Sequence, residues 1–93
     1  MQIGTGIKQF RKSRHIKQAD LAAKCDITPA YLSQIEKGQK SPRPDVLQSI
    51  ANALETSVQA LQLLSFTDLD IRDDRKQLFN DLMEKLKPII LER

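Results

Sequence analysis

Apolar residues recur with helical spacing along most of the chain, and short polar stretches divide them into segments. Ile3, Ile7 and Phe10 fall on one stripe, as the buried side of an amphipathic helix requires. The same pattern predicts helices over residues 3–14, 18–25, 28–37, 44–54 and 57–64. We therefore predict an all-α chain whose first five helices form one small domain, at residues 1–65.

Residues with known preferences for helix ends bound several of these segments. Thr28 is placed to cap the helix over residues 28–37, which should stop at Gly38. Pro44 can open the next helix, because the first turn of a helix does not need its missing N–H group. Ser57 is the expected cap of the fifth helix.

A sixth helix is predicted over residues 70–87, within a separate C-terminal element at residues 66–93. Asp68 or Asp70 is its expected cap, and Pro88 should end or kink it, because its ring clashes with the carbonyl four residues back. A wide apolar stripe follows this helix: Leu78, Phe79, Leu82, Met83, Leu86, Ile89 and Ile90. Two interpretations stay open: the stripe packs onto the first five helices, or it pairs with a second copy or another protein.

The charges are distributed unevenly along the sequence. Residues 1–43 contain nine Lys and Arg against three Asp and Glu, whereas residues 44–93 contain six against nine. A basic first half beside an acidic second half predicts a polyanionic partner for the first half alone.

Several functional classes find no support in the composition. One cysteine cannot form an internal disulfide, and no apolar run is long enough for a signal peptide or membrane span, so we expect a cytoplasmic protein without a membrane partner. His15 has no Cys or His partner at ligand spacing, and no nucleophile set or Gly-rich phosphate loop is present. We expect no metal, no cofactor and no enzymatic activity, and we expect Cys25 to pack as an apolar residue.

The helix over residues 28–37 divides into two unlike faces on a helical wheel at about 100° per residue. Its inner face holds Leu32, Ile35 and Glu36, and its outer face holds Ala30, Ser33, Gln34 and Lys37. Small and hydrogen-bonding side chains of this kind can approach base edges in a major groove, where Gln can bind adenine.

The order of these segments resembles the Cro/repressor (XRE-type) helix-turn-helix DNA-binding domains of phages and bacteria. The resemblance covers residues 3–64 and rests on "IKQFRKSRHIKQADLA", "YLSQIEKGQKSP" and "VLQSIANAL". It implies a lambda-repressor-like domain of five helices, with the helix-turn-helix at about residues 18–37 and double-stranded DNA as the partner. The helix over residues 28–37 would then lie in the major groove.

The resemblance also implies roles for individual residues. The expected base contacts are Thr28, Pro29, Ala30, Ser33 and Gln34. The expected phosphate contacts are Gln18, Lys37, Lys40 and Arg43, and Tyr31 either contacts a phosphate or packs at the helix edge. Arg11 and Glu36 match a pair that often forms a structural salt bridge in this family.

The sequence departs from the family pattern in both turns. Asp26 stands where the family usually has Gly, and it tolerates a left-handed conformation better than most residues. His15 and Lys17 replace a Gly and a Ser or Thr cap, which weakens the cap of the second helix.

These observations predict a sequence-specific transcriptional regulator, a homodimeric repressor that binds an inverted repeat. The alternative is an antitoxin-like or adaptor protein whose C-terminal helix binds a protein partner while the basic half tethers it to DNA.

Overall fold

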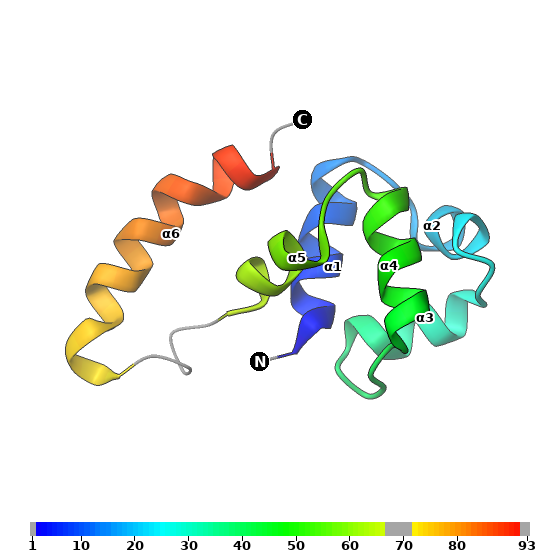
Figure 1. The fold of residues 1–93 in the computed structure, drawn as a ribbon, viewed down its shortest axis with the longest axis horizontal. Coiled ribbons are helices and arrows are strands. Elements are labelled where there is room, and N and C mark those ends of the chain that lie inside the picture. Colours follow the sequence, from blue (N-terminus) through cyan, green and yellow to red (C-terminus); the bar gives the residue numbers. More distant parts are fainter. Residues whose placement is uncertain (1, 67–71, 92–93) are drawn as a thin grey trace.

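The computed structural model describes residues 2–66 and 72–91, and these ranges are helical throughout apart from short connections. The elements are α1 (Ile3–Ser13), α2 (Gln18–Lys24), α3 (Pro29–Glu36), α4 (Pro44–Ala53), α5 (Val58–Ser65), the 3-10 helix η2 (Asp73–Arg75) and α6 (Lys76–Leu91). Helices α1 to α5 form one bundle, and α6 lies along the side of the bundle where α5 is found (Figure 1). The all-α prediction, with a five-helix domain and a C-terminal helix, is confirmed.

Helix α1 is central to the bundle because it packs against both α3 and α5. Two glycines allow this close approach. A Cβ atom on Gly4 would overlap the carbonyl oxygen of Ile35 in α3, and one on Gly6 would overlap that of Leu61 in α5. The core around α1 is built from apolar side chains that include Ile7, Phe10, Leu21, Leu32, Ile35, Ile50, Leu54, Leu61 and Leu64.

Local chemistry sets the helix ends as the sequence predicts. The Thr28 hydroxyl accepts a hydrogen bond of 3.1 Å from the backbone N–H of Tyr31, and the Ser57 hydroxyl does the same for Ala60 at 3.1 Å. Gly38 follows α3 with a φ of 76°, a conformation in which glycine carries no steric penalty. The predicted caps of α3 and α5 are therefore confirmed.

The turns on either side of α2 adopt the left-handed conformation without glycine. His15 and Asp26 both have a φ of 56°. The Asp26 value confirms that the turn between α2 and α3 forms despite the missing glycine. Lys17, before α2, makes no side-chain capping bond, as the departure from the family pattern predicts.

Helix α6 differs from its prediction at the C-terminal end. Of the two expected effects of Pro88, an end of the helix near residue 87 is wrong, because α6 continues to Leu91. A kink at Pro88 stays a prediction. A proline removes only its own backbone hydrogen bond, and the residues after it can still adopt helical dihedral angles, as they do through the last turn of α6. The expected caps, Asp68 and Asp70, lie outside the described residues. In the described part of the C-terminal element, the first helical segment is η2, which begins at Asp73.

The apolar stripe of α6 is shared between the bundle and the solvent. Met83 is buried at 5% exposure, and Phe79 and Ile90 pack against the core beside it. By contrast, Leu78, Leu82 and Ile89 are 63%, 51% and 67% exposed. We call these last three residues the outer edge of α6; they fall within about 40° of one another at 100° per residue. Leu86 is half-buried between the two groups.

Arg14 fastens the end of α6 to the bundle. Its Nη1 donates to the carbonyl of Leu91 at 2.8 Å, and its Nε donates to the carbonyl of Leu54, at the end of α4, at 2.7 Å. The guanidinium also lies 5.2 Å from the centre of the Phe10 ring. One side chain of α1 therefore joins the ends of two helices.

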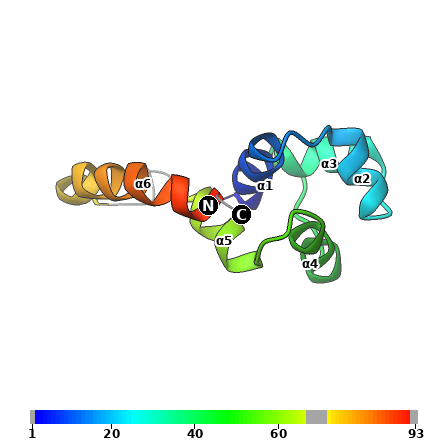
Figure 2. The same ribbon diagram turned by 90° about the horizontal axis from the view of Figure 1, so that it is seen from above.

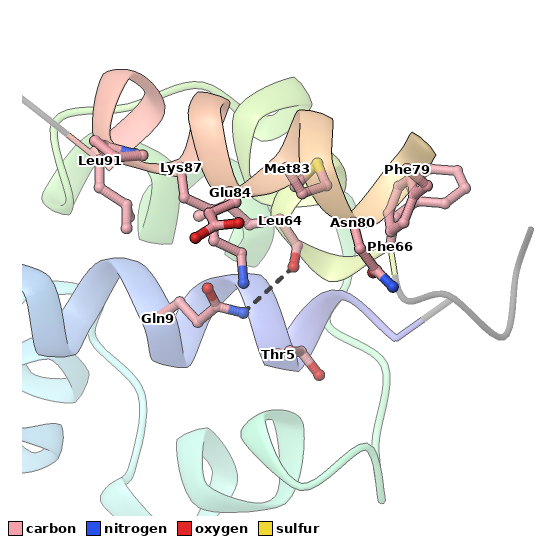
Figure 3. Close-up of a pocket in the computed structure, with 11 residues that line it drawn as sticks. Thr5, Gln9, Leu64, Phe66, Phe79, Asn80, Met83, Glu84, Lys87 and Leu91 are labelled. Atoms are coloured by element: carbon pink, nitrogen blue, oxygen red, sulfur yellow. Dashed lines mark hydrogen bonds between the residues drawn. The ribbon is translucent and has the colours of Figure 1, made fainter. Parts of the chain in front are cut away.

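Between the Arg14–Leu91 hydrogen bond and Phe79, a groove of about 650 Å³ separates α6 from α1 and α5. Figure 3 shows Gln9 and Lys87 pointing toward each other across it, with Met83 and Leu64 at its base. The Gln9 side chain donates to the Leu64 carbonyl at 3.4 Å. In the turned view α6 again extends away from α2, α3 and α4 (Figure 2), so it leaves their surface open. No helix in residues 2–66 or 72–91 is long and apolar enough to cross a membrane.

Candidate nucleic-acid interface

Helix α3 is anchored by one face and presents the other. Leu32 and Ile35 are buried at 0% and 1% exposure. The N-terminal residues Thr28, Pro29 and Ala30 are exposed, and Ser33 and Gln34 are partly exposed. The structure therefore brings all five predicted base-contact residues to α3 or its cap, on the side away from the core.

The α2–turn–α3 unit is short and closed by backbone hydrogen bonds. The N–H group of Ile27 donates to the carbonyl of Ala22 at 3.0 Å, which holds the turn around Asp26. Leu21 and Ala22 bury the inner side of α2. Two short helices held in this way present a rigid outer surface, as contact with a duplex requires.

Three of the residues predicted to contact phosphates follow the C-terminal end of α3 in an exposed position. Lys37, Lys40 and Arg43 are all exposed. The Lys40 ammonium lies 5.9 Å from the centre of the Tyr31 ring, a distance at which a cation and an aromatic face attract. Tyr31 is half-buried and packs against the core, so it belongs to both the packing and the surface.

The predicted Arg11–Glu36 ion pair is present and is bidentate. Arg11 Nε donates to Glu36 Oε2 at 2.8 Å, and Nη2 donates to Oε1 at 2.9 Å. The two side chains are 12% and 3% exposed, so solvent screens the pair poorly. Arg11 Nη1 also donates to the carbonyl of Ile16, which ties α1 to the start of α2.

Gln18 lies beside this pair at the first position of α2. Its Nε2 donates to Glu36 Oε1 at 3.2 Å. An amide nitrogen carries two hydrogens, so one remains after this bond. The family resemblance predicted a phosphate contact for Gln18, and the structure shows the side chain held in place by Glu36.

Two lysines that the sequence analysis did not single out adjoin this network. Lys8 and Lys12, one turn apart on α1, line a cleft of about 330 Å³ together with Arg11, Gln18, Ser33, Glu36 and Lys37. Their spacing of four residues, with Arg11 between them, was the available signal that α1 also has a basic face.

The remaining candidate residue, Cys25, is buried at 8% exposure within the core. Burial raises the pKa of its thiol, and the nearby Lys24 opposes this effect. The prediction that Cys25 packs as an apolar residue is confirmed. Among the residues that the structure describes, no group of His, Cys, Asp and Glu is arranged to hold a metal ion.

Comparison with known proteins agrees with this geometry. A family model described as "Helix-turn-helix" matches residues 7–61. An uncharacterised HTH-type transcriptional regulator of Mycobacterium tuberculosis is 30% identical over 94 aligned positions, which cover 85% of this chain and 67% of that protein. The immunity repressor protein of Bacillus phage phi105 is 36% identical over 61 positions, covering 66% of this chain but only 42% of the repressor.

Among solved structures, the clp gene regulator ClgR of Corynebacterium glutamicum superposes with a TM-score of 0.64 at 29% identity. That similarity covers 67% of this chain and 80% of the ClgR chain. The matched family model includes α2 and α3 and most of the surrounding bundle. With the exposed outer face of α3 and the basic residues around it, this match shows that the chain belongs to the Cro/repressor (XRE-type) helix-turn-helix family and is a DNA-binding transcriptional regulator.

Proposed function

We propose that this protein is a sequence-specific repressor that binds an inverted repeat as a homodimer. The observation that supports it most is the outer face of α3, which is exposed, carries hydrogen-bonding groups and is flanked by lysines that have no acidic partner within the described residues. Repression would follow from occupancy, since a protein bound at a promoter blocks the polymerase. The phage immunity repressor among its relatives supports repression over activation.

Within this proposal the side chains of α3 divide their tasks. Gln34 and Ser33 supply the directional hydrogen bonds to base edges, and Ala30 can contact a thymine methyl group. Thr28 and Pro29 approach the groove at the start of the helix. Few groups can make direct base contacts, so DNA shape supplies the rest of the specificity and phosphate contacts supply a larger share of the affinity.

Phosphate contacts hold the helix in its groove. Lys37, Lys40, Arg43 and Gln18 surround α3, and Tyr31 can add its hydroxyl. Affinity should then fall steeply with salt, because each neutralised phosphate releases counterions. The proposal contains no catalytic step, and it places the protein in the cytoplasm, where bacterial and phage DNA lies.

The outer edge of α6 supports the dimer. Leu78, Leu82 and Ile89 are more than half exposed, although residues of these types are usually buried. A second copy that covers this edge would remove apolar surface from water on both protomers. Twofold dimers of this architecture bind half-sites one helical turn apart, about 34 Å.

The first test is selection from a random duplex pool at about 0.15 M salt. We expect an enriched inverted repeat. Gln34→Ala should then cost ~1–3 kcal/mol on the selected sequence and relax the preference at one base pair. Lys37→Ala is the matched control, because it should weaken selected and random duplexes alike. Recovery of DNA with no shared sequence would reject sequence-specific binding.

The dimer is tested separately by sedimentation of Leu82→Glu. We expect this variant to be monomeric, whereas the charge-matched Gln59→Glu, on the exposed side of α5, should keep the wild-type mass. A wild-type protein that is already monomeric would reject the dimer. The outer edge of α6 would then favour the adaptor alternative, in which a different protein covers it.

A further inference from the structure

The cleft between α1, α2 and α3 concentrates positive charge beside the recognition helix. Lys8 and Lys12 come from α1, Gln18 from the start of α2, and Ser33 and Lys37 from α3 or its C-cap. These residues are far apart in the sequence and are brought together by the packing of α1 on α3.

The one carboxylate in the cleft is already neutralised. Glu36 accepts two hydrogen bonds from Arg11 and one from Gln18. The three lysines have no hydrogen-bond or ion-pair partner within residues 2–66 and 72–91. Their charges therefore add up over the cleft instead of being cancelled, which favours an anion there.

The surroundings favour a phosphate of the DNA backbone over a base. Lysine ammonium groups act as flexible point charges, and several of them around one small cleft suit the concentrated charge of a phosphate. The second amide hydrogen of Gln18 and the Ser33 hydroxyl add neutral donors to the same space. Ser33 also adjoins the outer face of α3, so a duplex bound there passes close to the cleft.

We propose that Lys8, Lys12 and Lys37 hold one backbone phosphate of each half-site in this cleft, with Gln18 as a fourth donor. Arg11 and Glu36 are positioning residues. Glu36 fixes the Gln18 side chain, and Arg11 neutralises Glu36 so that this carboxylate does not repel the phosphate. This inference rests on the proposed DNA-binding function and adds α1 to the interface. It also implies that Ser33 contacts the backbone as well as the groove.

The experiment measures DNA affinity against salt concentration for the wild-type protein, Lys8→Ala, Lys12→Ala and the double variant. Lys24→Ala is the control, because it removes one exposed lysine that does not line the cleft. We expect the double variant to weaken binding about threefold or more at 0.2 M salt and to flatten the slope of log K against log [salt] by about 1. Lys24→Ala should leave the slope unchanged.

A second measurement identifies the phosphate itself. Each backbone phosphate of the selected duplex is replaced in turn by an uncharged methylphosphonate. We expect one position in each half-site at which the replacement weakens the wild-type protein clearly more than the double variant, which keeps only Lys37 and Gln18 at that phosphate. Circular dichroism must show that all variants keep the wild-type helix content and unfolding midpoint.

The outcomes separate the two proposals. If the wild-type protein selects a sequence but Lys8→Ala/Lys12→Ala behaves like Lys24→Ala, the cleft is rejected and the proposed function stands. If every lysine variant, Lys24→Ala included, flattens the slope equally, the effect is one of net charge and the cleft is again rejected. If the wild-type protein binds no DNA, the proposed function fails first.

Discussion

Replacing Glu36 with alanine should test how far the Arg11–Glu36 pair holds the interface together. The substitution removes the acceptor of three hydrogen bonds, at 2.8, 2.9 and 3.2 Å, and leaves the Arg11 guanidinium at 12% exposure without its counter-charge. Breaking a buried pair by removing one partner costs about 3–5 kcal/mol. A domain of this size has only about 5–15 kcal/mol of stability, so the variant should lose a large share of it.

Urea denaturation followed by circular dichroism measures this loss directly. A double-mutant cycle with Arg11→Met and Glu36→Leu separates the pair from its surroundings, and the double variant should recover part of the loss, because no unpaired charge remains. The exposed pair of Arg43 and Asp45, 3.6 Å apart, supplies the control: Arg43→Met should change the free energy of unfolding by less than about 0.5 kcal/mol. A cost below about 1 kcal/mol for Glu36→Ala would refute the reasoning, because the pair would then behave like an exposed one.

Three further predictions concern the bundle. Gly4→Ala should cost about 3 kcal/mol or more, because its methyl group would overlap a backbone carbonyl of α3. Gly38→Ala should cost only about 1–2 kcal/mol, because its methyl group meets a flexible side chain and the cost comes from the left-handed backbone at a φ of 76°; urea midpoints compare the two. Ser65→Ala should cost about 1–3 kcal/mol in the same assay, because the N–H group of Gly6 loses a buried acceptor at 3.0 Å. Burial raises the pKa of Cys25, so its contribution to stability is complete below the unfolded pKa and is lost as the pH rises further. The wild-type protein should therefore lose more stability than Cys25→Ala between pH 8 and pH 10, and equal losses would contradict this.

The parts of the fold that depend on local chemistry could be predicted from the sequence. Thr28 and Ser57 cap their helices because a hydroxyl before a helix can accept from an early N–H group, whatever the tertiary structure. The buried side of α3 followed from helical spacing alone. The left-handed conformation at Asp26 was expected from the family resemblance, which places Gly there, and the short polar side chain of Asp tolerates it.

The parts that depend on packing between distant elements could not be predicted in this way. Nothing near Gly4 or Gly6 in the sequence indicates which backbone each one meets. The cleft was missed because Lys8 and Lys37 become neighbours only after α1 packs on α3. The end of α6 was expected too early, because Pro88 removes one backbone hydrogen bond but does not prevent the residues after it from staying helical.

The same limit applies to the C-terminal helix. Spacing identified its apolar stripe, but could not divide it between the core, which receives Met83, and the solvent, which receives the outer edge of α6. That division depends on the angle at which α6 meets α1 and α5. Arg14, which binds the end of α6, lies 77 residues away from its partner in that helix.

The attachment of α6 by Arg14 has a consequence for how the protein can diverge. Arg14 binds the backbone carbonyl of Leu91, and every residue type supplies such a carbonyl. Substitutions at the end of α6 therefore keep this attachment as long as the helix persists. The outward side chains of this helix can therefore be exchanged without loss of its attachment to the DNA-binding bundle.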